Sequence, residues 1–114
     1  MSLDLFSGIP VTDFAASLAW YERLLGAPPT LFATETEALW ELAEHRWVYI
    51  EQRPERAGHA LLSILVADLD ARVAQVATRG LEPARWETFE GTVRKATFVD
   101  PDGNEFGFGD ATQE

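Results

Sequence analysis

The side chains best suited to chemistry in this sequence are few and scattered. Two histidines, His45 and His59, and nineteen acidic residues are the candidate donors for a divalent metal ion, and there is no cysteine. The lack of cysteine excludes disulfides, thiolate zinc sites, iron–sulfur clusters and a cysteine nucleophile, and it is compatible with a reducing compartment. Neither Ser17 nor Ser63 has a histidine at a predictable spacing, and no Gly-rich phosphate loop occurs. No nucleophilic constellation stands out from these residues.

Aromatic side chains form a clearer pattern. In the segment Trp47-Val48-Tyr49-Ile50-Glu51, aromatic and acidic residues alternate with aliphatic ones. Successive side chains of a strand point to opposite faces, so Trp47, Tyr49 and Glu51 share one face. Aromatic rings stack on flat molecules and attract cations, and a carboxylate pairs with positive charge. This face is predicted to suit a flat or cationic organic molecule.

An internal repeat predicts the elements that position this face. Val11-Thr12-Asp13-Phe14 superposes on Val66-Ala67-Asp68-Leu69 when the sequence is shifted by 55 positions. In both copies an alternating apolar strand leads to an aspartate that can cap a helix, and a glycine ends that helix. The expected buried stripes are Phe14, Leu18, Tyr21 and Leu25 in the first helix, and Leu69, Val73 and Val76 in the second.

Three short strands are expected after each helix. They lie near 31–34, 38–43 and 47–51, and near 84–88, 93–99 and 105–109, with turns at 44–46, 89–91 and 100–104. The order is therefore βαβββ, twice. One such unit cannot bury both its helix and its sheet, so two units are expected to pair into one α+β domain with a curved eight-stranded mixed sheet. We place the single domain at 1–114 and its modules at 1–57 and 58–114.

The charge of the chain excludes some partners. Nineteen acidic against nine basic residues give a net charge of −10, which repels nucleic acid and anionic membrane surfaces. No apolar run is long enough to cross a membrane and the N-terminus does not resemble a signal peptide, so a cytoplasmic protein is expected.

Two segments resemble the vicinal oxygen chelate superfamily, the group of glyoxalase I, bleomycin-resistance proteins, fosfomycin-resistance enzymes and extradiol dioxygenases. They are Ile9-Pro10-Val11-x-Asp13 leading into Ser17–Gly26, and Phe98-Val99-Asp100-Pro101-Asp102-Gly103-Asn104. The resemblance implies helices outside a sheet that surrounds a cleft, and a homodimer that shares this cleft. It also implies a divalent metal ion held by imidazole and carboxylate side chains.

The positions at which relatives bind the metal ion are mostly filled by other residues. The two expected histidines correspond to Phe6 and Leu61, and the expected glutamate of the last strand corresponds to Gly107. Glu51 alone falls where a carboxylate ligand can occur, and one carboxylate does not make a metal site. A displaced site of His59, Glu51 and Glu105, with Zn, Ni, Mn or Fe, stays open as the alternative; His45 is assigned no role.

We therefore expect a metal-free protein that binds a small aromatic or cationic molecule for sequestration or sensing, with no cofactor. The alternative is a metal-dependent lyase or dioxygenase of the same superfamily, and a third possibility is a dimer with a vestigial cleft. The sequence leaves open whether Trp40 and Trp86 face the cleft or the core, and whether Arg94 or Lys95 faces it to hold an anion. The predicted ligand-binding residues are Phe6, Trp47, Tyr49, Glu51, Leu61, Ser63 and Glu105.

Overall fold

Each half of the chain folds into a strand, a helix and three further strands, in the order that the repeat predicts. The computed structural model describes residues 2–89 and 93–110. The first module comprises β1 (Leu5–Val11), α1 (Phe14–Leu25), β2 (Leu31–Thr34), β3 (Glu37–Ala43) and β4 (Arg46–Gln52). A short 3-10 turn, η1 (Pro54–Arg56), precedes the second module. That module comprises β5 (Leu61–Val66), α2 (Leu69–Thr78), β6 (Arg85–Phe89), β7 (Val93–Val99) and β8 (Glu105–Asp110).

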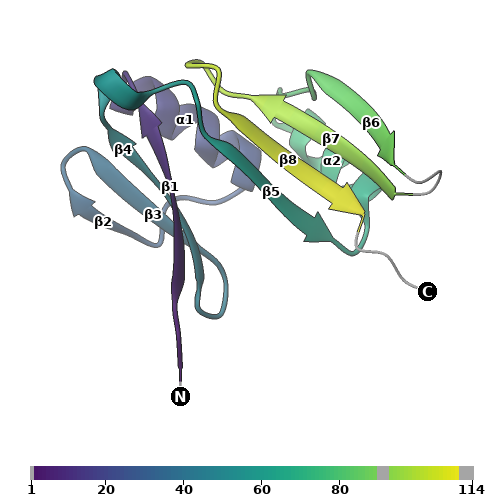
Figure 1. Ribbon diagram of the computed structural model, residues 1–114, viewed down its shortest axis with the longest axis horizontal. Coiled ribbons are helices and arrows are strands. Elements are labelled where there is room, and N and C mark those ends of the chain that lie inside the picture. The colour runs from purple at the N-terminus through teal and green to yellow at the C-terminus, as the bar shows by residue number, and fades with distance from the viewer. Residues whose placement is uncertain (1, 90–92, 111–114) are drawn as a thin grey trace.

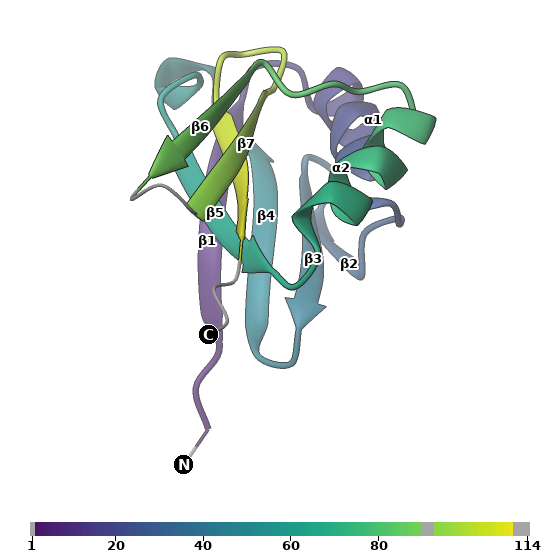
Figure 2. The ribbon, with the colours of Figure 1, turned by 90° about the vertical axis from the view of Figure 1, so that its right-hand side faces the viewer.

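The eight strands are divided between two four-stranded sheets. Their orders are β1-β4-β3-β2 and β5-β8-β7-β6, and in each sheet the first and last strands of the module pair in parallel while the others pair antiparallel. Figure 1 shows the two sheets side by side with both helices behind them. The side view of Figure 2 places α1 and α2 on the same side of the strands. Each sheet therefore has one face covered by a helix and one open face.

Both predicted helix starts are confirmed, and Gly26 ends α1 as expected; α2 ends at Thr78 with Arg79 as its C-cap, one residue before the predicted Gly80. Asp13 accepts a hydrogen bond from the amide of Ala16 at 3.1 Å, and Asp68 accepts one from the amide of Ala71 at the same distance. Gly26 follows α1 with a φ of 79°, a left-handed conformation that glycine adopts without strain. The caps satisfy amides of the first helical turn that have no partner within the helix.

The buried side of α1 is wider than the predicted stripe. Ser17, Trp20, Tyr21 and Leu24 are buried, whereas Phe14, Leu18 and Leu25 are only partly buried. The physical reason is that α1 packs against two modules. The ring of Tyr21 lies 6.2 Å from that of Phe106 in the second module, and the hydroxyl of Tyr21 also reaches that module. A stripe derived from one module alone therefore missed part of the contact.

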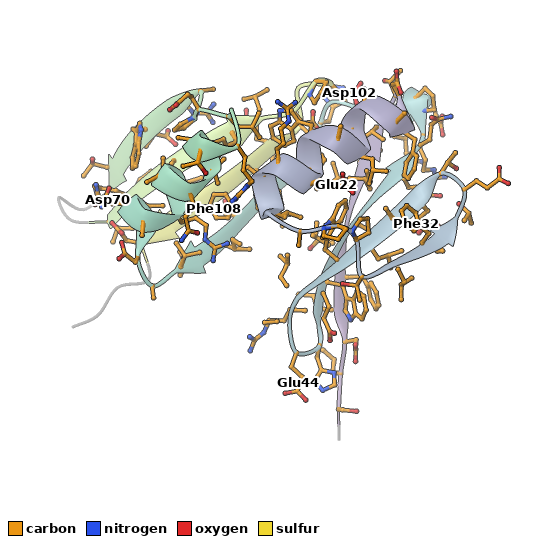
Figure 3. The ribbon with its side chains drawn as sticks, turned by 180° about the vertical axis from the view of Figure 1, so that it is seen from behind. Glu22, Phe32, Glu44, Asp70, Asp102 and Phe108 are labelled. Carbon is orange, nitrogen blue, oxygen red and sulfur yellow. The ribbon has the colours of Figure 1, made fainter. Side chains whose placement is uncertain are left out.

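One apolar core joins the two modules on the helix side. Its members from the first module include Ile9, Trp40, Val48 and Ile50. The second module contributes Phe98, Phe106 and Phe108, whose rings contact one another. Figure 3, seen from the helix side, shows Phe108 beside α2. Strand alternation predicts that Ile9, Val48, Ile50, Phe106 and Phe108 pack against the helices, and their burial confirms this.

The turn from Asp100 to Asn104 also ties the modules together. The side chain of Asn104 donates to the carbonyl of Pro10 at 2.9 Å and accepts from the amides of Gly58 and Ala60 at 3.0 and 2.9 Å. Tyr21 donates its hydroxyl to Asp100 at 2.8 Å. Burial of this hydroxyl and the nearby carboxylate raise the pKa of Tyr21. The turn thus joins β1, α1 and the connection between the modules.

The two other predicted turns have different outcomes. The turn between β3 and β4 is present, and His45 adopts a left-handed conformation there with a φ of 66°. The turn predicted at Phe89-Glu90-Gly91 falls on Glu90 and Gly91, which lie outside the described residues, and Phe89 ends β6. Neither α1 nor α2, the two helices of the described ranges, is long and apolar enough to cross a bilayer.

Candidate functional site

The open face of the first sheet carries the aromatic residues that the sequence predicts to share a face. The parallel pairing of β1 with β4 sets Phe6 opposite Trp47, Gly8 opposite Tyr49, and Pro10 opposite Glu51. Their chain neighbours Ile9, Val48 and Ile50 are buried on the other side of the sheet. The structure therefore brings four of the predicted ligand-binding residues, Phe6, Trp47, Tyr49 and Glu51, together on one surface.

Phe6 and Trp47 form a stacked pair. Their ring centroids lie 5.4 Å apart with an interplanar angle of 15°. The indole nitrogen of Trp47 donates to Asp4 at 2.9 Å, and the Nδ1 of His45 lies 2.9 Å from the other carboxylate oxygen of Asp4. These hydrogen bonds lower the pKa of Asp4, because they favour its charged form. The segment before β1 thus fixes the orientation of the indole ring.

Tyr49 lies across β1 because residue 8 has no side chain. A Cβ atom at Gly8 would lie 2.6 Å from the Cζ and hydroxyl oxygen of Tyr49. Beside the ring is a hollow of about 180 Å³, whose lining includes Pro10, Glu51 and Arg56. A hollow of this order accommodates a single aromatic ring, since a cavity of about 150 Å³ binds benzene. Aromatic surface, a small hollow and a carboxylate therefore adjoin one another.

The open face of the second sheet differs from the first. The parallel pairing of β5 with β8 sets Leu61 opposite Glu105 and Ser63 opposite Gly107. Leu61 is 79% exposed, so the isobutyl group projects into solvent. Glu105 is engaged by Arg85, whose guanidinium donates to it at 2.7 Å. Leu61, Ser63 and Glu105 thus share a face as predicted, but the carboxylate already has a cationic partner.

The structure resolves the placement of the two uncertain tryptophans. Trp40 is buried on the helix side, where its indole nitrogen donates to the carbonyl of Ala27 at 2.9 Å. Trp86 pairs with Ala96, a buried residue of the helix side, and its ring lies under the guanidinium of Arg94 at 5.6 Å. Both tryptophans therefore belong to the helix side and not to the open faces.

The structure does not bring the candidate metal ligands together within the described ranges. Within residues 2–89 and 93–110, no three histidine, aspartate or glutamate side chains gather as a metal site would need. His59 is exposed in the connection before β5, and Glu105 is bound to Arg85. The alternative set of His59, Glu51 and Glu105 is therefore not assembled. Phe6, Leu61 and Gly107, at the positions expected for ligands, offer no donor side chain.

A second hollow lies on the helix side, between the modules. It has a volume of about 450 Å³, and its lining includes Leu25, Trp40, Ile64 and Arg72. The polar end of Trp40 is already bonded there, and Arg72 lies over the ring of Phe108 at 5.4 Å. This groove lacks the stacked aromatic surface of the first sheet, and we assign it no function.

Three residues near the open faces were not among the predicted site residues. Asp4 fixes Trp47, Arg85 engages Glu105, and Lys95 extends across Gly107. Strand alternation offered a signal for Lys95, because residues two and four positions apart on a strand share a face, and Lys95 therefore lies on the same face of β7 as Thr97 and Val99. Arg94, the other candidate for an anion, points to the helix side and binds Asp70 of α2. No pattern in the sequence indicates that Asp4 would reach Trp47.

Comparisons with known proteins agree with this architecture. A family model described as the Glyoxalase/Bleomycin resistance protein/Dioxygenase superfamily matches residues 3–108. A crystal structure titled glyoxalase/bleomycin resistance protein, from Catenulispora acidiphila DSM 44928, is 52% identical, with a TM-score of 0.94 over 97% of this chain and 100% of that chain.

More distant structures share the fold. A bleomycin-binding protein complexed with bleomycin is 21% identical, with a TM-score of 0.76 over 97% of this chain and 100% of that one. A fosfomycin resistance protein from Listeria monocytogenes is 15% identical, with a TM-score of 0.72 over 98% of this chain and 95% of that one. The search of curated proteins gives no match.

Proposed function

The chain belongs to the glyoxalase/bleomycin resistance protein/dioxygenase superfamily, and we propose that it binds a small aromatic or cationic organic molecule on the open face of its first sheet, for sequestration or sensing and without a metal ion. Membership alone does not decide the chemistry, because one fold supports many functions. The proposal therefore rests on the site. We place the activity in the cytoplasm, with which a chain without cysteine is compatible.

The observation that carries the proposal is the stacked pair of Phe6 and Trp47 beside Tyr49. Phe6 is 48% exposed although it belongs to a strand that buries Ile9 and Val11 completely or nearly so. Exposed rings that are already ordered lose little conformational entropy when a flat ligand stacks on them. An ordered aromatic surface is thus suited to recognition by shape and stacking.

The charge near these rings favours a cation. Glu51 lies in the hollow beside Tyr49, and although Arg53 and Arg56 also line this hollow, neither forms an ion pair with Glu51 within 4.0 Å. Glu105 is not available in the same way, because Arg85 binds it. Electrostatic preference for a cation on the first sheet therefore depends on Glu51, and the net charge of −10 attracts cations at longer range.

A structural neighbour supports this use of the fold. The bleomycin-binding protein was crystallised with bleomycin, an organic compound, in the same fold. We extend to this chain only the general point that the fold can hold an organic molecule. The identity of 21% is too low to carry over a particular ligand.

We further propose that two copies of the chain pair through their open faces. Leu61 and Leu65 on β5 are 79% and 68% exposed, and they alternate with Leu62 and Ile64, which pack against the core on the helix side. Exposed aliphatic side chains arranged along one strand are unfavourable in water, and a second copy would bury them. Such a homodimer would also enclose the aromatic surface and deepen the binding site.

Ligand screening tests the proposed function. We expect planar aromatic cations to raise the melting temperature and to quench the fluorescence of Trp47. Trp47→Leu should weaken binding about tenfold, because a lost stacking contact is worth about 1–2 kcal/mol. Trp86→Leu is the matched control, since Trp86 lies on the helix side and its loss should leave affinity unchanged.

The proposed homodimer has its own test. Light scattering on the same samples should give the mass of a dimer.

Two results would contradict the proposal. If no aromatic or cationic compound stabilises the wild-type protein, the cleft is vestigial. If protein purified without chelators holds a stoichiometric divalent ion that His59→Ala removes, the metal-dependent lyase or dioxygenase alternative replaces the metal-free function.

A further inference from the structure

The only lysine of the chain lies on the open face of the second sheet. Lys95 is the single lysine among 114 residues, and β7 places it on the same face as Thr97, opposite Gly109 of β8. A Cβ atom built on Gly107 would lie 2.5 Å from the Cε of Lys95 and 3.3 Å from the hydroxyl oxygen of Ser63. The end of the lysine and the serine hydroxyl therefore both border the space above Gly107.

The direction of this side chain is unexpected from charge alone. Glu87 is the direct cross-strand partner of Lys95 on β6, and a pair of opposite charges there would be favourable. Glu87 instead lies 3.7 Å from Arg85, while Lys95 extends to the other side, over Gly107. Within residues 2–89 and 93–110, the ammonium group has no carboxylate within 4.0 Å. A half-buried cation thus lies on this face without a counter-ion from those residues.

A second, independent observation concerns Thr97. This residue is 1% exposed, and its hydroxyl has no hydrogen-bond partner within the described residues. It lies directly opposite Gly107 in the antiparallel pairing of β7 with β8, on the open face. A buried hydroxyl without a partner is unfavourable, which indicates that a further group completes the bonding here. The cation and two hydroxyls thus surround one glycine.

We propose that Lys95, Ser63 and Thr97 form a binding site for a carboxylate on the open face of the second sheet. The ammonium group supplies the positive charge, the hydroxyl of Ser63 donates to one carboxylate oxygen, and the orphaned hydroxyl of Thr97 gains a partner. Gly107 is required because any larger side chain would occupy the space above it. The site goes beyond the proposed function, since it lies on the other sheet and does not depend on an aromatic ligand.

The neighbouring charges are compatible with an anion. Arg85 binds Glu105 at 2.7 Å and lies 3.7 Å from Glu87, and together with Lys95 it balances the charge of these two carboxylates. The net charge of −10 opposes the approach of anions at long range, and added salt screens this repulsion. Recognition must therefore come from close contacts at the site, which is where a mutation can test it.

The single lysine provides a direct measurement. In protein labelled with ¹³C at the lysine Cε, the spectrum holds one lysine signal, and we expect it to shift on titration with benzoate but not with benzamide, the neutral analogue of similar shape. Affinity measured by calorimetry should favour benzoate about tenfold, and Lys95→Gln should abolish this preference. Lys95→Arg should keep part of it, because the charge is retained.

Matched controls separate this site from general charge effects. Arg23→Gln removes one positive charge from the end of α1 on the helix side, and it should leave the preference unchanged. A lysine signal that does not move with benzoate, or an equal preference in Lys95→Gln, would overturn the carboxylate site even if aromatic cations bind the first sheet. A lysine signal that moves while the aromatic screen fails would sustain this site and contradict the proposed function.

Discussion

The two modules share a backbone plan but present different open faces. The capping aspartates, Asp13 and Asp68, occupy the same place in both copies, and the first and last strands pair in parallel in both sheets. On the first sheet, however, the open face carries stacked aromatic rings, whereas on the second it carries an ion pair and a lysine. Residues that build the fold are thus repeated, and residues that face outward from the sheets have diverged.

The difference teaches that scaffold and surface can vary separately in this fold. Each module uses one glycine to let a neighbouring side chain lie flat on the sheet. In the first module Tyr49 lies over Gly8, and in the second Lys95 lies over Gly107. A glycine on the neighbouring strand therefore leaves room for an aromatic ring in one module and for the end of a lysine in the other.

The largest expected effect concerns the turns that precede the two closing strands. Asn104 makes four side-chain hydrogen bonds, whereas His45, in the corresponding turn of the first module, contacts exposed carboxylates. We expect Asn104→Ala to lower the free energy of unfolding by about 3 kcal/mol, because it leaves buried polar groups without partners. Urea denaturation with circular dichroism measures this.

His45→Asn serves as the control for that turn. Asparagine tolerates the left-handed conformation, so the free energy of unfolding should change by about 0.5 kcal/mol or less. Equal losses in both variants would contradict the view that only the second turn joins the modules.

The next effect is a loss of stability at alkaline pH. The raised pKa of Tyr21 means that the folded protein keeps this proton when the unfolded chain releases it above about pH 10. The contribution of Tyr21 to the free energy of unfolding is fully present below that pH, and above it the free energy of unfolding falls by about 1.4 kcal/mol per pH unit. Chemical denaturation between about pH 8 and about pH 11.5 measures the slope, because this range extends to both sides of the pKa of a free tyrosine, about 10.

Tyr21→Phe should remove this alkaline slope, at the cost of lower stability at neutral pH because Asp100 loses a buried donor. A slope that persists in the variant would assign the alkaline loss to other groups.

The smallest effect distinguishes the two glycines. Gly8→Ala should cost about 1 kcal/mol, because the new methyl group displaces an ordered tyrosine ring. Gly107→Ala should change the free energy of unfolding by about 0.5 kcal/mol or less, since the new methyl group meets the flexible end of Lys95 and the small hydroxyl of Ser63. Thermal denaturation of both variants compares them, and the reverse order would show that the lysine is the more tightly held side chain.

Much of the fold could be predicted from the sequence because its determinants are local. Alternation placed Ile9, Val48 and Ile50 on the buried side, and the aspartate caps located both helix starts. The positions of Trp40 and Trp86 were not predictable, because a one-residue shift in a short strand moves every side chain to the other face. The structure shows both on the helix side.

The site was predicted less completely than the fold. The shared face of Trp47, Tyr49 and Glu51 followed from alternation, but the pairing of Glu105 with Arg85 joins strands that are not adjacent in sequence. Lys95 extends over Gly107 of β8, where no side chain is in the way, and not toward its cross-strand partner Glu87 of β6. The pattern of residues within β7 does not contain this information. Binding at both faces stays a prediction.

The bond between Asn104 and Pro10 spans 94 positions of the chain, and that between Asp100 and Tyr21 spans 79. During synthesis on a ribosome, the first module can form its local helix and hairpin long before either partner has left the exit tunnel. Its first strand and helix obtain these buried polar partners only when the turn at 100–104 emerges. The N-terminal half of the nascent chain therefore lacks these hydrogen bonds until residues 100–104 have emerged.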